Sequence, residues 1–218
     1  MSKTRNFAVV LSGCGVFDGA EIHESTLTLL AIKKHGADYE IFAPDINQFH
    51  VVNHITGKEM NEKRNVLVES ARIARGKIKP LSEFNASNFD GLIFPGGFGA
   101  AKNLSDYAFK GTLVKVLPEV EKAIKNMASA HKPIGALCIA PTLLAKVLGN
   151  ISITIGQDEN TANDIKKMGA FHIKTQPREV AIDKKNKIVT NPCYMLDSNI
   201  VDIAEGAENV VKEMLKMM

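Results

Sequence analysis

The segment KPIGALCIAPTLLAKV, residues 132–147, decides the fold. Its first part, Pro133 to Leu137, is small and apolar and predicts a short buried strand. Its last part, Pro141 to Val147, is apolar at helical spacing and predicts a helix. Cys138 stands between the two. A strand that turns directly into a helix exposes its turn residue at the carboxyl edge of a sheet, so the segment predicts a nucleophile elbow at Cys138.

The position of Cys138 suggests a reactive thiol. It is expected beside the amino end of a helix, whose partial positive charge favours the thiolate. Pro141 suits the first turn of that helix, because proline lacks an N–H group that would be unpaired there. A buried core residue is the commoner fate of a lone cysteine, so this segment alone leaves both a catalytic and a structural role open.

The composition is that of an ordinary globular protein: 218 residues, 45% hydrophobic and 23% charged. We expect one α/β domain over residues 1–218, because two separate domains would be small. The formal net charge is +3 and the basic residues are scattered, so no nucleic-acid partner is predicted. The three cysteines are far apart and predict neither a disulfide framework nor a C-x-x-C metal site.

The location is expected to be cytoplasmic. The amino end, MSKTRNFAVVLSG, has an apolar run too short for a signal peptide. No segment approaches the roughly 18 apolar residues of a membrane span, so we expect no membrane partner. Free thiols persist in a reducing compartment, which the cytoplasm provides.

The first half of the chain reads as a parallel α/β unit. Phe7 to Leu11 is a continuous apolar run typical of a strand buried on both faces. The loop SGCGVFDGAEIHES follows with three glycines, at the sheet edge where ligand sites collect. A helix is predicted over Ser25 to His35, with Glu24 just before it, and a second strand over Tyr39 to Ala43. This βαβ order implies a parallel sheet with right-handed crossovers.

The middle of the chain is less regular. Residues 45–88 contain an excursion with a turn at Thr56-Gly57 and a predicted helix over Asn61 to Arg75. A third strand over Phe89 to Phe94 leads into PGGFGAAKNLSDY. The N–H groups of the Pro-Gly-Gly turn suit an oxyanion or a phosphate, and a plain tight turn is the alternative. The glycine spacing does not fit G-x-G-x-x-G, so a dinucleotide site is not expected.

The second half continues the alternation of strands and helices, which predicts a mostly parallel sheet with helices on both faces. The expected elements are a helix over Leu113–Ala130, a strand over Ile151–Ile155, a helix over Thr161–Met168, a strand over Phe171–Lys174, a hairpin of Glu179–Asp183 with Lys187–Thr190, and a final helix over Ser198–Lys216.

With these elements placed, the chain resembles the ThiJ/PfpI superfamily, which is related to class I glutamine amidotransferases. More closely, SGCGVFDGAEIHE, NHITG, RNVLVESARIARG, PGGFGAAKNLS, CIAP and NKIVTNPCYM look like its isoprenoid-biosynthesis glyoxalase (ElbB) branch. The resemblance covers nearly the whole chain. It implies a flavodoxin-like three-layer sandwich, a homodimer, and glyoxalase-type activity on a small reactive aldehyde with no added cofactor.

The resemblance also assigns roles. The family nucleophile matches Cys138, and the acid that hydrogen-bonds it matches Glu24. The oxyanion loop matches Gly96 and Gly97, completed by the N–H of Ile139. Some members place a histidine after the nucleophile; Ile139 stands there in this chain, which disfavours peptidase and glutaminase activity.

Further residues are candidates for the pocket. His23 lies in a loop that could reach it, although a lone histidine is more often structural. Cys14 follows the first strand and is either a pocket-lining residue or a second reactive thiol. Asn103 is either a pocket amide or a residue at a helix start. Cys193 has no evident partner. Cys, His and carboxylate residues do not occur at metal-ligand spacing, so no metal is expected.

The expected reaction converts glyoxal, or methylglyoxal, to a 2-hydroxy acid. Cys138 forms a hemithioacetal and Glu24 moves a proton between adjacent carbons, which gives glycolate from glyoxal. Two alternatives stay open. One is a deglycase that acts on glycated protein or nucleotide adducts. The other is a non-enzymatic sensor in which Cys138 is oxidised to a sulfinate.

Overall fold

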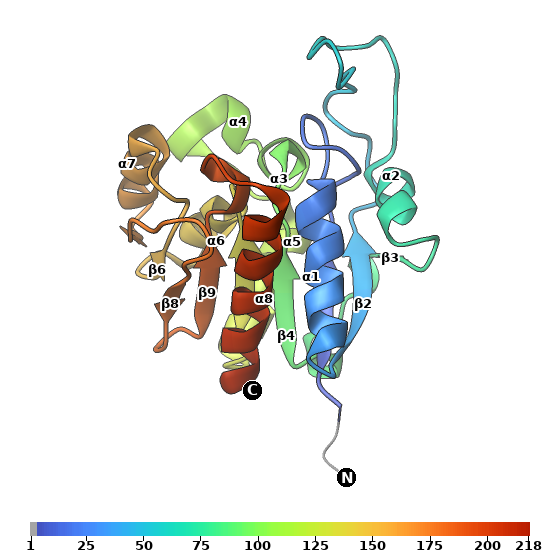
Figure 1. Cartoon of the computed structure of the whole chain (residues 1–218). Helices are drawn as coiled ribbons and strands as arrows, with labels where there is room; N and C mark the ends of the chain where they lie inside the picture. The colour runs from blue at the N-terminus through green and yellow to red at the C-terminus, as the bar shows by residue number, and fades with distance from the viewer. Residues whose placement is uncertain (1–3) are drawn as a thin grey trace.

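The computed structural model describes residues 4–218 and is organised around a seven-stranded sheet (Figure 1). The strand order is β3-β2-β1-β4-β5-β9-β8, parallel throughout except for the edge strand β8, which is antiparallel to β9. The strands are β1 (Asn6–Val10), β2 (Asp38–Ala43), β3 (Lys79–Pro80), β4 (Gly91–Phe94), β5 (Ile134–Leu137), β8 (Ala181–Asp183) and β9 (Ile188–Asn191). This confirms the α/β class, the mostly parallel sheet and the predicted hairpin.

Helices cover both faces of the sheet, which gives the predicted three layers. Alternate residues of β1 serve the two cores: Phe7 and Val9 pack on one face, and Ala8 and Val10 on the other. Because both sides of each central strand are buried, these strands are apolar without interruption. The first face holds α1 (Ile22–Lys34) and α8 (Ile200–Lys216), side by side in Figure 1; the second holds α3 (Phe98–Lys102), α5 (Pro118–Ser129) and α6 (Pro141–Leu148).

The helix starts differ from prediction because capping side chains set them. Helix α1 begins at Ile22, since the Glu21 carboxylate caps it and accepts from the N–H of Glu24 at 2.6 Å. Glu24 therefore lies in the first turn of α1 and not before the helix. Helix α2 (Val66–Ile73) begins later than expected, where the Asn65 side chain accepts from the N–H of Val68. Helix α5 begins only at Pro118, a proline in its first turn.

Two smaller features complete the chain. Residues 44–65 rise above the carboxyl edge of the sheet as an irregular arm (top of Figure 1), closed by an isolated bridge between Val52 and Glu59. Strands β6 (Ser152–Ile153) and β7 (Phe171–His172) form a separate two-stranded parallel sheet, shorter than predicted. The remaining helices are α4 (Tyr107–Lys110) and α7 (Glu159–Lys167).

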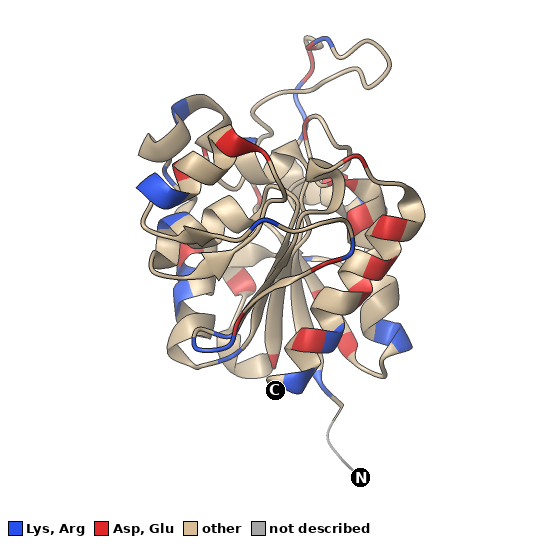
Figure 2. Ribbon diagram, turned by 60° about the vertical axis from the view of Figure 1, so that its left-hand side comes forward, with Lys and Arg blue, Asp and Glu red and all other residues tan. Residues whose placement is uncertain are grey.

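Positions held by Lys or Arg and by Asp or Glu are interspersed along the helices and loops (Figure 2). Within residues 4–218, no helix is long and apolar enough to cross a membrane. Residues 1–3 lie outside the described part of the chain. The predicted domain and the amino-terminal segment that was considered as a signal peptide both begin with these residues.

Candidate active site

Cys138 occupies the predicted elbow between β5 and α6. Strand β5 ends at Leu137 and α6 begins at Pro141, so the turn is only three residues long. Cys138 has φ 57°, a left-handed conformation that costs a residue with a side chain about 1–3 kcal/mol. Its N–H donates to the carbonyl of Asn191 on the adjacent strand β9 at 3.0 Å. The paired strands hold the turn in place and offset its strain.

Gly96 lets the Pro-Gly-Gly turn approach the elbow. A Cβ atom at Gly96 would stand 2.4 Å from Cys138 Cβ and 2.7 Å from Glu24 Oε2. No real Cβ makes contacts this short, so a side chain at this position is excluded. The turn is therefore part of the site and more than a loop closure.

Glu24 is fully buried beside Cys138. Its Oε2 accepts from the N–H of Gly96 at 2.8 Å, and its Oε1 accepts from the N–H of Tyr194 at 3.4 Å. Burial is the largest cause that raises the pKa of Glu24 to about 8, and the neighbouring Glu21 carboxylate is the second. These hydrogen bonds, and one with the Cys138 thiol, oppose the rise in pKa. At neutral pH Glu24 is mainly a neutral acid, with a pKa suited to proton transfer.

The pKa of Cys138 is raised well above its ordinary value, which corrects the expectation of a thiolate favoured by the helix end. The side chain is only 7% exposed, and burial is the largest cause of the shift. The charge of Glu24 adds to it, while the N–H groups of Gly97 and Ile139 lower the pKa. The field of a helix end fades within one turn and is outweighed here by desolvation. The resting pair is a thiol hydrogen-bonded to a carboxyl group.

The Pro-Gly-Gly turn offers one N–H group fewer than expected for an oxyanion site. The N–H of Gly96 is already used by Glu24, so it is not available to a substrate oxygen. The N–H groups of Gly97 and Ile139 both reach the sulfur of Cys138. These two donors are therefore the pair that stands where negative charge would develop.

Tyr194 is a residue that sequence reasoning missed. Besides its N–H bond to Glu24, its hydroxyl shares a hydrogen bond with Nδ1 of His23 at 2.8 Å. His23 is exposed in the first turn of α1 and not in a loop, which corrects its predicted position. Tyr194 belongs to the loop after β9, at the same sheet edge as the elbow. The available signal was topological: carboxyl ends of neighbouring parallel strands meet at one edge.

Asn103 and Cys14 lie apart from this pair. The Asn103 amide donates to the carbonyls of Ser12 and Asp18, both at 2.8 Å, and its oxygen accepts from the N–H of Phe49 at 3.0 Å. It binds the glycine-rich loop to the arm and stands at the carboxyl end of α3, so it takes neither of the roles that the sequence left open, a pocket amide or a residue at a helix start.

The surroundings of Cys14 differ from those of Cys138. Burial raises the pKa of Cys14, with Glu69, Arg72 and Asp18 as the charges that act on it. Glu24 and Cys138 are not among them. The N–H of the neighbouring Gly13 donates to Ser70 Oγ of α2 at 2.9 Å, so this part of the loop lies against α2. Among residues 4–218, no group of three or more His, Cys, Asp or Glu side chains is placed to hold a metal ion.

The DJ-1/PfpI family model matches residues 14–190, which include the glycine-rich loop, the Pro-Gly-Gly turn and the elbow. The chain belongs to the DJ-1/PfpI family. This confirms the resemblance to the ThiJ/PfpI superfamily that the sequence motifs indicated.

The chain is similar in sequence to a human protein and similar in fold to two proteins of known structure. The human glutamine amidotransferase-like class 1 domain-containing protein 3 is 47% identical over 220 residues, with 96% of this chain and 82% of that protein covered. A crystal structure from Ehrlichia chaffeensis, described as an isoprenoid biosynthesis protein with an amidotransferase-like domain, has a TM-score of 0.92 and 37% identity and covers 98% of this chain and 99% of that one. Glyoxalase III from Candida albicans shares the fold, with a TM-score of 0.63 and 14% identity over 98% and 97% of the two chains.

The expectation of a cytoplasmic location is wrong by this comparison. The human protein is named mitochondrial, as are similar proteins from rat and zebrafish. Similarity therefore points to the mitochondrion. The presence of free thiols separates oxidising from reducing compartments and does not distinguish one reducing compartment from another.

Proposed function

We propose that the protein is a cofactor-independent glyoxalase that converts glyoxal to glycolate. One observation carries the proposal: a buried thiol, Cys138, is hydrogen-bonded to a buried acid, Glu24, and faces the N–H groups of Gly97 and Ile139. This arrangement supplies a nucleophile, a proton carrier and an oxyanion site in one place.

The reaction uses no external oxidant. The sulfur of Cys138 adds to one aldehyde carbon, and its proton passes through Glu24 to the carbonyl oxygen, which gives a hemithioacetal. In the fraction of molecules with ionised Glu24, the carboxylate then takes the hydrogen of that carbon as a proton and returns it to the neighbouring carbon. The hydroxyl proton of the first carbon moves to the oxygen of the second, so that one carbon is oxidised and the other reduced. The product is a thioester of glycolate. Water cleaves the C–S bond, releases glycolate and restores the thiol.

The burial of Cys138 favours a small substrate. With 7% of the residue exposed, the thiol is accessible to a two- or three-carbon aldehyde more readily than to an adduct on a protein surface. A deglycase that acts on such adducts is therefore the weaker candidate. Trapping free aldehyde during the assay separates the two, because adduct loss that continues under trapping would indicate a deglycase.

We also propose a branch for the chain within the DJ-1/PfpI family. Similarity to the Ehrlichia chaffeensis protein supports the isoprenoid-biosynthesis glyoxalase branch. With that branch we propose a homodimer, which light scattering of the purified protein tests. We also propose a mitochondrial location, which cell fractionation tests.

The deciding experiment measures glycolate formed from glyoxal by the wild type, Cys138→Ala and Cys14→Ala. Loss of turnover in Cys138→Ala alone is expected. Cys14→Ala is the matched control, because it also removes a thiol but lies outside the Cys138–Glu24 pair. Turnover by Cys138→Ala at the wild-type rate would reject the proposed mechanism.

A further inference from the structure

Cys193 is a second buried thiol at the site, and neither the proposed reaction nor the sequence motifs give it a role. It follows β9 by two residues and is 2% exposed. It lies in the same apolar cluster as Cys138, on the face of the sheet covered by α1 and α8. The two thiols are therefore on one face, at the same edge.

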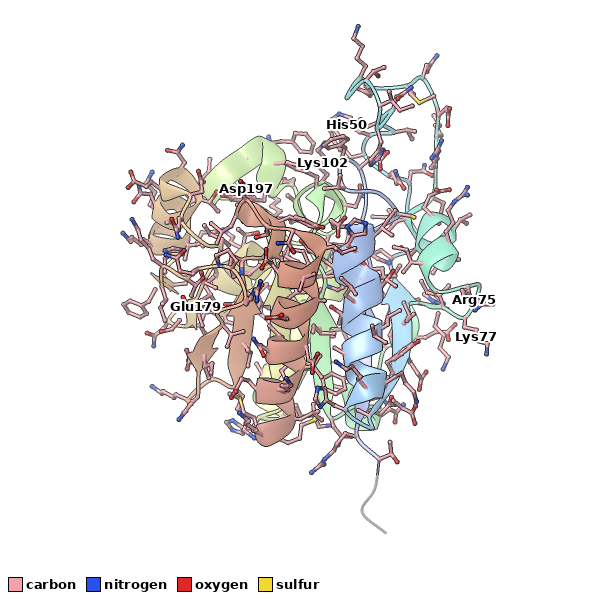
Figure 3. The ribbon with its side chains drawn as sticks, in the orientation of Figure 1. His50, Arg75, Lys77, Lys102, Glu179 and Asp197 are labelled. Carbon is pink, nitrogen blue, oxygen red and sulfur yellow. The ribbon has the colours of Figure 1, made fainter. Side chains whose placement is uncertain are left out.

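Asn191 fixes the backbone of both cysteines. Its carbonyl accepts from the N–H of Cys138 at 3.0 Å, and its side-chain oxygen accepts from the N–H of Cys193 at 2.8 Å. Its amide group donates to the carbonyl of Glu179 at 2.6 Å (Glu179 is labelled in Figure 3). Gly206 of α8 closes the other side, since a Cβ there would stand 2.6 Å from the Asn191 oxygen. One immobile residue thus sets the separation of the two cysteines.

The strand register brings the two cysteines to one point of the sheet edge, close enough for Cys138 to act on Cys193 electrostatically. Leu137 and Asn191 are direct partners on adjacent parallel strands, which lie about 4.8 Å apart. Cys138 is the next residue after Leu137, and the Asn191–Cys193 side-chain bond turns the chain back at the end of β9. Disulfides join Cα atoms about 4.4–6.8 Å apart, the same scale as this strand spacing.

We infer that Cys193 is a resolving thiol, which forms a disulfide with Cys138 after a hydroperoxide has oxidised Cys138. The inference does not depend on aldehyde turnover. Cys138 is the more exposed of the two, 7% against 2%, so the oxidant meets Cys138 first. Cys193 is shielded from bulk solvent and reacts only with its neighbour.

The disulfide forms in two steps. The sulfur of Cys138 attacks one oxygen of the hydroperoxide, the O–O bond breaks, and the thiol proton passes to the departing oxygen, so that a sulfenic acid and an alcohol or water result. The sulfur of Cys193 then attacks the sulfenic sulfur, an S–S bond forms, and the S–O bond breaks with release of water. Glu24 carries the proton from Cys193 to the departing oxygen. Its charge acts on both thiols, and its Oε1 accepts from the N–H of Tyr194, the residue next to Cys193.

The test uses the purified, fully reduced protein and hydrogen peroxide. After treatment, free thiols are alkylated and intact mass and peptide mapping follow. The protein has three free thiols, so the expected product loses two hydrogen atoms, retains one alkylated cysteine at Cys14, and contains a linked pair of Cys138 and Cys193 peptides. Dithiothreitol restores all three thiols. Wild type that gains oxygen atoms on Cys138 while Cys193 is alkylated overturns the inference.

Two variants give the matched comparison. Cys193→Ser has no resolving thiol, so Cys138 is expected to proceed to the sulfinic acid, which dithiothreitol does not reverse. Cys14→Ser is expected to form the disulfide as the wild type does. A link between Cys138 and Cys14 in the wild type would overturn the assignment to Cys193. Because the wild-type result alone decides whether the disulfide forms, the test stands even if a variant folds poorly.

Discussion

Gly96 is where the site tolerates the least change. The positions closest to its absent Cβ are taken by Cys138, Glu24 and the carbonyl of Leu137, all within 2.8 Å. We expect Gly96→Ala to separate the thiol from the acid, with large losses of both thermal stability and glyoxal turnover. Gly36→Ala is the control: Gly36 has φ +73° with nothing within 4 Å, so that change adds about 1 kcal/mol of strain without crowding the site. Equal effects of the two substitutions would contradict the steric argument.

Glu24→Gln separates catalysis from stability. Turnover is expected to fall by about two to four orders of magnitude, because the amide cannot accept and return a proton. The folded pKa of Glu24 is about 8 against an ordinary 4.5, so the contribution of Glu24 to wild-type stability is fully present below pH 4.5 and is lost as the pH rises through 8. At about 1.36 kcal/mol per pKa unit, the loss is several kcal/mol.

The variant lacks this titration. We expect Glu24→Gln to melt above the wild type at pH 8 and the difference to shrink toward pH 5, as measured by circular dichroism melting. A difference that grows as the pH falls would contradict the raised pKa. Near-wild-type turnover would remove Glu24 from the mechanism.

The residues that sequence reasoning identified are those with both a local motif and a defined place at the sheet edge. Cys138 has its strand–turn–helix pattern, and Glu24 follows the glycine-rich loop after the first strand. Tyr194 and Cys193 lie at the same edge, but residues 192–195 form a short turn whose sequence has no periodic signal and points to no chemical role. The raised pKa of Cys138 was also beyond local reasoning, because its burial comes from packing with distant parts of the chain.

At the scale of elements, helix capping explains why α1 begins earlier than the spacing of its apolar residues predicts. Helix α1 gains a turn that the apolar spacing does not show, because Glu21 caps its first N–H groups. That extra turn carries Glu24 into the sheet edge. Strand positions were predicted well for the opposite reason: β1, β4 and β5 are buried on both faces, and continuous apolar runs are their direct signature.

The cap of α1 also offers a test of the site's electrostatics. Glu21 is the charge that raises the pKa of Glu24 after burial. Glu21→Gln keeps a side-chain oxygen for the cap and removes that charge, so the pKa of Glu24 is expected to fall. The rising limb of the pH–rate profile for glyoxal should then move to lower pH. Glu159→Gln, in the first turn of α7, is the control, and an equal shift there or none in Glu21→Gln would contradict the assignment.

At the scale of the whole molecule, one sheet unites both halves of the chain. Strand β9 lies between β5 and β8, and α8 packs against α1 from the opposite end of the sequence. We expect residues 4–218 to unfold as one cooperative unit. Guanidinium unfolding followed by far-ultraviolet circular dichroism and by tyrosine fluorescence should give coincident transitions. Two separated transitions would contradict the prediction of a single domain.

The late position of β9 has a consequence for synthesis on the ribosome. Until residues 188–191 have been made, β5 has a partner only on its β4 side and is the open edge of a growing sheet. Open edges invite pairing with other chains. Cys138 directly follows the same strand, and at that stage its turn lacks both the Asn191 carbonyl that holds it and the loop that covers Glu24. The nascent chain thus passes through an interval in which the unpaired edge of β5 and the Cys138 thiol are exposed together. Both are covered once β9 has been made and pairs with β5.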